Sequence, residues 1–295
     1  MKDLGHLSYF LGLEITHSTD GLYITQAKYT SDLLSRVGLT GSKTVDTPVE
    51  LNAYLTPSGG KPLSNPSLYR WLVGSLIYLI VTCPDISYAV HQVRQYLSAP
   101  RSTYYAAILR ILRYLKGTLF HCFFYSAQSP LVLHAISDAD WARDPTDRRS
   151  NTSYCFLLGS SLISWRNKKQ TLMARSSTEI EYCAFANTTS ELLWLWWLLK
   201  DLGVSISSAT PLYCDNHSVI HIAHNDVFHE GLNISRLIVI LSVIILSMVH
   251  SSSSQSPPKI NLQISSPSHI LRNAFVLWLT TSNWSHTYLE FEGGS

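Results

Sequence analysis

Apolar and polar residues alternate at the start of the chain. The stretches YFLGLEIT and GLYITQ, residues 9–16 and 21–26, follow the period of two that is typical of strands, and Thr19-Asp-Gly lies between them as a turn. A hairpin is therefore predicted, followed by a helix at about residues 26–37. Beyond a Pro-, Gly- and Ser-rich loop the apolar spacing becomes helical again. Three further helices are predicted at residues 68–80, 85–97 and 104–118.

The pattern changes after residue 130, where strands come first and a helix follows. A strand over 131–141, a hairpin that turns at Gly159 and a further strand within 168–177 precede one long helix. Ser177 or Thr178 is the expected N-cap of this helix. A fourth strand and a second helix follow at residues 210–216 and 217–225. The order β-β-β-α-β-α predicts an α/β domain with a mixed sheet and helices packed on its faces.

The net charge and the cysteines narrow the class of protein. A formal charge of +2 gives no general affinity for polyanions, so nucleic-acid binding would need local clusters of cations. The five cysteines are scattered and lack the spacing of a zinc site or a disulfide framework. A reducing, intracellular location is expected, cytoplasmic or nuclear and not secreted. The apolar run 237–249 is 13 residues long, short of the ~20 needed to span a bilayer, and no membrane partner is expected.

The composition changes abruptly after Glu230. The last 65 residues hold three of the 22 Lys and Arg, two of the 20 Asp and Glu, and 14 serines. No acid occurs from Gly231 to Leu289. Such a Ser-rich, nearly uncharged stretch is typical of segments that do not build a packed core. The tail, residues 231–295, is therefore expected to be disordered or ill packed.

Three acids fall where this element order can bring them together. Asp138 lies on the first strand of the mixed sheet, Glu181 one turn into the long helix, and Asp215 at the end of the fourth strand. Clustered carboxylates repel one another unless a cation offsets their charge, and Mg²⁺ or Mn²⁺ takes such hard oxygen ligands. Each acid also has an ordinary alternative: Asp138 as a turn cap, Glu181 as solvated helix surface, and Asp215 as a helix cap. The shared location favours a metal site.

Long motifs support that interpretation. SDADWA, RRSNTSYCFLLGSSLISWRNKKQ, ARSSTEIEYCAFANTTSELLWL and LYCDNHSVIHIAHNDVFH resemble the ribonuclease H domain of copia-type (Pseudoviridae-like) retrotransposon Pol polyproteins. Upstream, MKDLGHLSYFLGLEI, YRWLVGSLIYL, CPDISYAVHQVRQYLSAP and RILRYLKGT resemble the end of the reverse transcriptase palm and the thumb and connection of the same polyprotein. The resemblance implies an α+β reverse transcriptase remnant over residues 1–125 and a ribonuclease H-like mixed sheet over 126–230, followed by the tail.

The resemblance further implies a nuclease that cuts the RNA strand of an RNA/DNA hybrid, with Mg²⁺ held by Asp138, Glu181 and Asp215. Glu181, within EYCA, takes the catalytic role, and Glu179 is left as a helix-cap or outer-shell acid. Two groups of cations would contact the nucleic-acid backbone, although either could instead be solvated surface. The first group is Arg110, Arg113 and Lys116, and the second is Arg166, Lys168, Lys169 and Arg175.

The chain departs from the family pattern in several places. Cys83 and Tyr104-Tyr105 stand where the family has Arg and His-Trp, so the contacts of the connection are in question. A polymerase needs an adjacent Asp-Asp pair, and this chain has none. We therefore expect it to begin after that pair and to lack DNA synthesis.

The family's basic segment, which supplies a fourth acid, should follow VFHE, where this chain has GLNISRLI. With suitably chosen codons, residues 231–240 and 259–267 read one base out of phase give TKHIEIDCH and NQLADFFT, which resemble the family. A lost base after the Glu230 codon would explain the tail and the loss of the last helix.

Three functions follow from these observations. The first is a degenerate, inactive fragment with a ribonuclease H fold and a three-acid site. The second is an active hybrid ribonuclease, in which Asp226 or Glu230 replaces the fourth acid. The third is a non-catalytic nucleic-acid-binding protein that uses the two groups of cations. We expect the first, with RNA/DNA hybrid as the ancestral partner.

Overall fold

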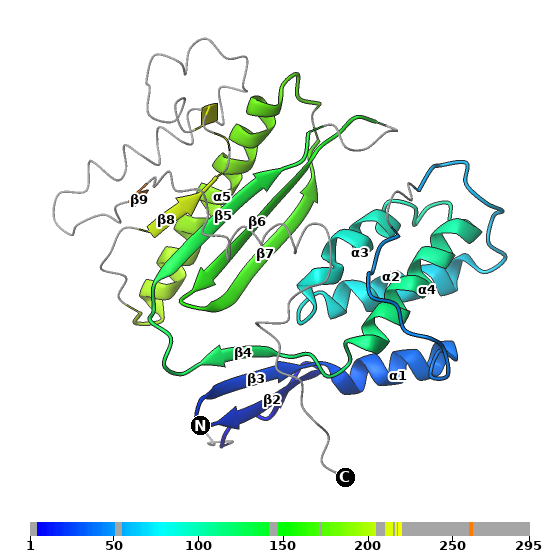
Figure 1. The fold of residues 1–295 in the computed structure, drawn as a ribbon, viewed down its shortest axis with the longest axis horizontal. Coiled ribbons are helices and arrows are strands. Elements are labelled where there is room, and N and C mark those ends of the chain that lie inside the picture. The colour runs from blue at the N-terminus through cyan, green and yellow to red at the C-terminus, as the bar shows by residue number, and fades with distance from the viewer. Residues whose placement is uncertain are drawn as a thin grey trace. The chain divides into compact units, whose positions relative to one another are not determined.

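A computed structural model describes residues 5–50, 55–141, 147–171, 173–204, 210–214, 216, 218–219 and 260–261. The chain forms two compact units, and the boundary between them lies between Gln128 and Ser129 (Figure 1). Each contains one sheet and at least one helix, which confirms a mixed α/β fold class.

The first unit opens with a small antiparallel sheet. Its strands are β1 (Tyr9–Phe10), β2 (Leu13–Ser18), β3 (Gly21–Thr25) and β4 (Phe123–Ser126), in that spatial order. β2 and β3 form the predicted hairpin, with Ser18 opposite Gly21. The first predicted strand, residues 9–16, is instead divided by a turn at residues 11–12 into β1 and β2, which pair with each other. The sequence pattern does not predict β4, because FFYS is a short apolar run without alternation. It becomes a strand by pairing with β3, from Ile24 opposite Phe123 to Gly21 opposite Ser126.

The described first unit also contains four α-helices and one short 3-10 helix. They are α1 (Ala27–Val37), α2 (Pro66–Leu79), η1 (Pro84–Ile86), α3 (Ser87–Arg94) and α4 (Ser102–Gly117). The four predicted helices are confirmed to within a few residues at their ends. Asn65 caps α2 by accepting a hydrogen bond from Leu68 N at 3.1 Å, and Pro66 occupies the first turn, where a missing N–H is tolerated. α1 ends at Gly38, whose φ of 72° is left-handed.

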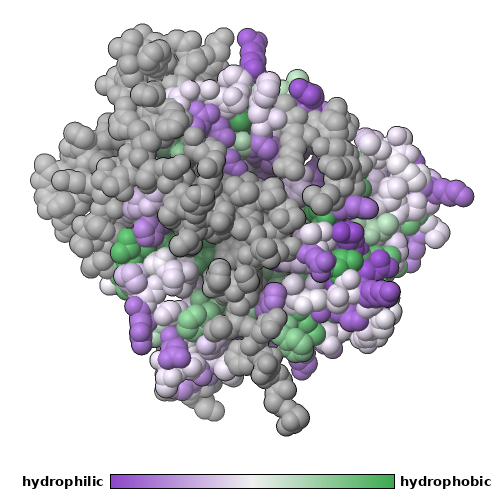
Figure 2. Space-filling view, viewed as in Figure 1, coloured by the Kyte–Doolittle hydropathy of each residue, from purple (hydrophilic) through white to green (hydrophobic). Residues whose placement is uncertain are grey.

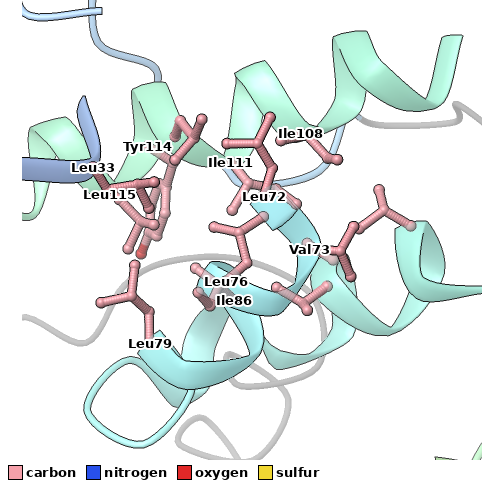
Figure 3. Close-up of a cluster of buried hydrophobic side chains, with 14 of the residues drawn as sticks. Leu33, Leu72, Val73, Leu76, Leu79, Ile86, Ile108, Ile111, Tyr114 and Leu115 are labelled. Carbon is pink, nitrogen blue, oxygen red and sulfur yellow. The ribbon is translucent and has the colours of Figure 1, made fainter. Parts of the chain in front are cut away.

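One apolar core holds these helices together. Leu72, Val73, Leu76 and Leu79 recur at helical spacing on one face of α2 and are fully buried. Figure 3 shows this face and the buried side chains of α4, such as Ile111, pointing toward one another. Burying a leucine or isoleucine of this kind contributes roughly 2 kcal/mol, so this shared core of α1, α2, α3 and α4 stabilises the unit.

The second unit is built on a five-stranded sheet. Its strands are β5 (Leu133–Ala139), β6 (Asn151–Leu158), β7 (Ser161–Lys169), β8 (Thr210–Tyr213) and β9 (Ile260–Asn261), in the spatial order β7-β6-β5-β8-β9. The first three are antiparallel neighbours, and β8 runs parallel to β5, with Ala135 opposite Leu212. The helical return from β7 to β8, beside β5, is the predicted crossover.

Two predictions fall largely outside the described residues. Of the second helix, predicted over 217–225, only residues 218–219 are described, and they are helical. Of the tail, the structure describes only β9, which pairs in parallel with β8. At these two residues the expectation that the tail does not pack is wrong, and the rest of the tail lies outside the described residues.

One predicted strand is wrong. The range 168–177 contributes only its first two residues, at the end of β7, and Gln170, Thr171 and residues 173–176 are not in a strand. The reason is that β6 begins at Asn151, which pairs with Lys169, so β7 has no partner beyond that point. Gln170 instead donates its backbone N–H to Ser150 O at 2.8 Å and closes the ladder.

α5 (Ser177–Asp201) is the long helix, and it covers one face of the sheet (Figure 1). Its N-cap is Ser176 and not Ser177 or Thr178, because Ser176 Oγ accepts a hydrogen bond from Glu179 N at 3.1 Å. The Glu179 carboxylate reaches back and accepts from Arg175 N at 2.8 Å, much as in a capping box. The helix packs on the sheet through a second apolar core that includes Ala135, Phe156, Tyr182, Phe185 and Leu192.

Polar residues dominate the described surface on the face seen in Figure 2, and hydrophobic ones occur there in small separate groups. Within the described ranges, no helix has the length and apolar character needed to cross a bilayer.

Candidate acidic site at the end of the sheet

β5 divides its side chains between the two faces of the sheet. Successive residues of a strand point to opposite faces, and the register of β5 against β6 is unbroken along the strand. Ser137 and Ala139 face α5, since Ser137 Oγ lies 2.9 Å from Thr188 Oγ1 and Ala139 packs against Ile180. Asp138 therefore lies on the opposite face, half-buried, one residue before the strand ends.

Glu181 lies on the face of α5 that is turned to the sheet. It begins a stripe at helical spacing whose other members are buried. They are Ala184, Phe185, Thr188, Leu192, Leu195 and Leu199. Glu181 itself is only 7% exposed, which excludes the alternative that it is solvated helix surface. A carboxylate at such a position gives up hydration that an apolar side chain would not need.

The direction of α5 carries Glu181 toward the end of β5. Thr188 meets Ser137, while Ile180, about two turns earlier in the helix, meets Ala139 at the end of the strand. α5 is therefore antiparallel to β5, and its first turns lie over the edge where Asp138 is found. The two acids approach this edge from opposite sides of the sheet.

Asp215 lies outside the described residues, but its neighbours mark the end of the strand and the start of the next helix. β8 ends at Tyr213. Asn216 Oδ1 accepts hydrogen bonds from Ser218 N at 3.0 Å and from Val219 N at 3.3 Å, so Asn216 is an N-cap. The alternative interpretation gave this cap to Asp215 together with Asn216, and for Asn216 it is confirmed. Because β8 is parallel to β5, their carboxyl ends meet at the same edge.

Two neighbouring acids have structural roles. The Asp140 carboxylate accepts from Asn151 Nδ2 at 2.9 Å and also from the Asn151 backbone N–H, and so joins the end of β5 to the start of β6. Glu179 caps α5, as predicted. These bonds give Asp140 a role at the junction of β5 and β6 and Glu179 a role at the start of α5.

The sequence analysis missed the polar side chains that share the face of Asp138. Ser153 is opposite Asp138 in the register, and Asn167 Nδ2 donates to Ser153 Oγ at 2.9 Å. Directly opposed residues share a face of the sheet, so a polar row crosses three strands at this point. Polar residues at alternate positions of adjacent strands are the signal that would have found it.

The donors suit Mg²⁺ in kind, since carboxylate oxygens are the hard ligands that this ion takes. Within the described ranges, no three His, Cys, Asp or Glu side chains lie close enough together to hold a metal ion. A third donor would have to come from Asp215, outside those ranges. The Mg²⁺ site at Asp138, Glu181 and Asp215 therefore stays a prediction.

The cysteines offer no competing chemistry. None of the five cysteines, all within the described ranges, forms a disulfide bond. Burial raises the pKa of Cys155 to about 12, and burial together with nearby Glu179 raises that of Cys183 to about 11. Both thiols stay protonated at neutral pH and are poor nucleophiles and metal ligands.

Comparison with known proteins gives the family. The chain is 44% identical over 232 residues to the retrovirus-related Pol polyprotein from transposon RE2 of Arabidopsis thaliana, and 35% identical over 238 residues to that from transposon TNT 1-94 of Nicotiana tabacum. It is also 43% identical over 194 residues to an uncharacterized mitochondrial protein of Arabidopsis thaliana, of which it covers 80%. The chain belongs to the copia-type Pol polyprotein family. No family model matches it.

The copia-type chain spans only a small part of its polyprotein relatives. The alignment covers 79% of this chain and 16% of the RE2 polyprotein, and 78% of this chain against 18% of the TNT 1-94 polyprotein. For the mitochondrial protein it covers 66% of this chain. The activities of a whole Pol polyprotein therefore do not follow from the match.

In the copia-type chain, two members of the first group of cations bond to the protein itself. Arg110 Nη2 donates to Thr47 Oγ1 at 2.8 Å and Arg110 Nε donates to Thr47 O at 3.1 Å. Lys116 Nζ donates to Ser42 O at 2.6 Å. Arg113, between them in the sequence, is half-buried. A phosphate bound by Arg110 or Lys116 would have to replace these bonds, and the binding role stays a prediction.

The second group of cations lies along β7 and before α5. Arg166 and Lys168 are exposed, on the sheet face that carries α5, because Arg166 pairs with Tyr154 of the second core. Arg166 Nη1 donates to Tyr154 Oη at 3.4 Å, and this bond raises the pKa of Arg166. Lys169 lies on the other face and forms an ion pair with Asp147 at 2.9 Å. Their role toward nucleic acid, like that of exposed Arg175, stays a prediction.

Proposed function

We propose that this chain is a retrotransposon-derived protein with a ribonuclease H-like domain over residues 126–230, ancestrally a nuclease that cuts the RNA strand of RNA/DNA hybrids. The sheet supports this proposal most. The chain passes through three antiparallel strands, a helical crossover and a parallel fourth strand. This path places Asp138, the first turns of α5 and the end of β8 at one edge of the sheet. The relation to copia-type Pol polyproteins supports the same assignment.

Asp138, Glu181 and Asp215 are the residues that would hold Mg²⁺. When bound, the ion supplies a water of lowered pKa and neutralises charge on the phosphate that is cleaved. Asp138 would contribute its carboxylate from the face opposite α5, and Glu181 from the side of α5. A hybrid would thus be held at the end of the sheet, where exposed Arg175 adds positive charge for the phosphate backbone.

The present protein is proposed to be inactive or nearly so. Two-ion hydrolysis needs enough carboxylates to hold both ions, and the family's fourth acid has no counterpart in residues 231–240. Asp226 and Glu230 are the only acids between Asp215 and Glu290. Genomic DNA that carries an uninterrupted family reading frame, one base out of phase after codon 230, is the expected finding. An in-frame sequence with no such alternative would remove the frameshift.

Residues 1–125 are proposed to be the end of a reverse transcriptase palm with its thumb and connection. The helical core of α1 to α4 and the short antiparallel sheet agree with an α+β remnant. Without an Asp-Asp pair, this chain has no paired carboxylates for polymerase chemistry by itself.

Cleavage of an end-labelled RNA/DNA hybrid in Mg²⁺ tests the proposal. The wild-type protein is compared with Asp138→Asn and with Asp201→Asn, which alters an exposed acid at the far end of α5. For a degenerate fragment, none of the three cuts above the buffer control. For an active nuclease, wild type and Asp201→Asn cut and Asp138→Asn is slower by about 100-fold or more. Cleavage that Asp138→Asn leaves unchanged would refute the site.

Binding without cleavage would favour the alternative of a non-catalytic nucleic-acid-binding protein. Its signature is a dissociation constant for the hybrid that rises steeply with salt, because bound cations release counterions from the phosphates. Replacing Arg166 and Lys168 together by alanine should then lower the slope of log affinity against log salt by about one for each phosphate that the variant no longer neutralises. An unchanged slope would exclude these two residues from the interface.

A further inference from the structure

Two histidines face each other at the start of the first unit. β1 pairs with β2 in antiparallel fashion, and the pairing extends past β1, where Ile15 N donates to Ser8 O at 2.9 Å. The same register, extended by two residues, would place His6 opposite His17, and the structure has the two ring centroids 5.1 Å apart. Directly opposed residues of an antiparallel pair point to the same face, with Cβ atoms ~4.5–5.5 Å apart. The two imidazole rings are therefore neighbours because of the fold.

A backbone carbonyl fixes the hydrogen on one of these rings. His17 Nε2 lies 2.9 Å from Leu7 O. A carbonyl oxygen can only accept, so Nε2 carries the hydrogen and Nδ1 keeps its lone pair in the neutral ring. Histidine ligands in metal sites are commonly oriented in this way, with one ring N–H on a carbonyl or carboxylate. His17 is thus held in a tautomer that a metal ligand needs.

The separation of the rings fits a shared ion. A metal ~2.0–2.1 Å from one nitrogen of each ring, with ligands near the tetrahedral angle, sets the ring centroids about 5 Å apart. The centroids of His6 and His17 are 5.1 Å apart, with an angle of 54° between the ring planes. Both side chains are exposed. An ion can therefore reach them without any change in the core, and water can complete its coordination.

We propose that His6 and His17 form a two-imidazole site for Zn²⁺. Imidazole nitrogen suits Zn²⁺ and its neighbours in the first transition row, whereas Mg²⁺ prefers oxygen. The site at His6 and His17 thus differs in ligand chemistry from the proposed Mg²⁺ site of the second unit, and it does not depend on the proposed nuclease. Two protein ligands with water make an open, exchangeable site, unlike the closed four-ligand sites that stabilise zinc folds. A bound ion joins the segment before β1 to β2 and stabilises the pairing of β1 with β2.

A local measurement on the full chain tests this site. Diethyl pyrocarbonate modifies unprotonated imidazole, and peptide mass spectrometry reports the modification of each histidine separately. Rising Zn²⁺ should protect His6 and His17 together, with one midpoint, and leave His121 unaffected. Mg²⁺ at the same concentrations should protect neither. This part of the test needs no variant, and wild-type protein whose His6 and His17 react equally with and without Zn²⁺ overturns the proposal.

Variants then separate a shared ion from two independent ones. In His6→Ala, the Zn²⁺ concentration that protects His17 should rise about tenfold or more, because one of the two protein ligands is lost. His121→Ala, which removes a histidine elsewhere in the same unit, should leave the midpoint at His17 unchanged. An unchanged midpoint in His6→Ala would mean that the rings do not share an ion and would overturn the proposal.

Discussion

Two buried tyrosines of the first unit and one buried carboxylate of the second unit have different surroundings. The tyrosines bond to the protein's own backbone: Tyr69 Oη donates to Val93 O at 2.6 Å, and Tyr104 Oη donates to Thr56 O at 2.7 Å. In the second unit, Glu181 begins the apolar stripe of α5 and faces the sheet, where its carboxylate is almost fully buried.

The two kinds of group differ in what their burial costs. A tyrosine hydroxyl bonded to a carbonyl satisfies both atoms and contributes about 1 kcal/mol. A buried carboxylate loses hydration worth several kcal/mol, which its contacts must offset. Buried hydroxyls bonded to carbonyls are explained by their contribution to stability. A buried carboxylate, which carries a hydration cost, is a candidate for function. The variants below test whether this distinction holds.

The largest effect is expected in the core of the first unit. Leu76→Ala removes a fully buried side chain between α2 and α4. It should lower the free energy of unfolding by about 3 kcal/mol, because apolar burial is reduced and a cavity is left behind. Ile77→Ala, on the outer face of the same helix and 38% exposed, should cost less than about 1 kcal/mol. Urea unfolding followed by circular dichroism measures both, and equal losses would contradict the packing seen in Figure 3.

The next effect concerns a buried acid that does support its fold. Tyr114 Oη donates a hydrogen bond to the Asp85 carboxyl group. Tyr114→Phe removes this donor and should lower the free energy of unfolding by about 2 kcal/mol, as expected for a bond to a buried carboxyl group. Tyr104→Phe, which loses a bond to a backbone carbonyl, should cost about 1 kcal/mol. Urea unfolding at neutral pH gives both values, and a smaller loss for Tyr114→Phe would contradict the assignment.

The same acid gives a pH dependence of defined sign. Burial raises the pKa of Asp85, and the hydrogen bond from Tyr114 only partly opposes this shift. The folded state thus holds the proton more tightly than the unfolded chain, so the stabilising contribution is complete at low pH and is lost as pH rises through the folded pKa. Relative to Asp85→Asn, which does not titrate, the wild-type protein should lose stability as pH rises from about 4 toward neutrality. A slope of the opposite sign would show that the carboxylate form is favoured.

A smaller effect tests whether the cations of α4 serve the fold. Arg110→Met keeps the apolar stem but removes both bonds to Thr47, and it should cost about 1.5 kcal/mol. Arg113→Met, one turn further along, should cost less than about 0.5 kcal/mol. If the group also binds nucleic acid, both variants should weaken hybrid binding at low salt. Weaker binding in Arg113→Met alone would assign phosphate contact to Arg113 and a structural role to Arg110.

The sequence predicts the elements of the fold better than it predicts their ends and partners. α2 and α4 follow from apolar spacing alone, which depends only on neighbours in the chain. β4 and the end of β7 do not, because a strand exists only where a partner edge exists. FFYS becomes a strand because β3 offers an edge, and Gln170 leaves β7 because β6 has already begun at Asn151.

For the candidate site, too, the sequence predicts the elements but not the contacts between them. The order of strands and helices suffices to predict that Asp138 and Glu181 approach one edge of the sheet. The face on which Asp138 lies depends on the register of β5, and the partners of Arg110 and Lys116 lie in a distant loop. His6 and His17 lack the sequence spacing of a known metal motif. They become neighbours only because the segment that leads into β1 runs beside β2. Contacts between segments far apart in the sequence are what local patterns cannot supply.

The smallest expected effect is a gain in stability, and it tests most directly the comparison between Glu181 and the buried tyrosines. Glu181→Leu continues the apolar stripe of α5 and should raise the free energy of unfolding by about 1 kcal/mol, because no carboxylate then loses its hydration. Glu191→Leu, half-buried on the flank of α5 beside Tyr154, should give no gain. Urea unfolding followed by tryptophan fluorescence measures both, and any hybrid cleavage should vanish in Glu181→Leu but remain in Glu191→Leu. A loss of stability in Glu181→Leu would mean that the contacts of Glu181 within the protein exceed its hydration cost, and that it serves the fold as Tyr69 does.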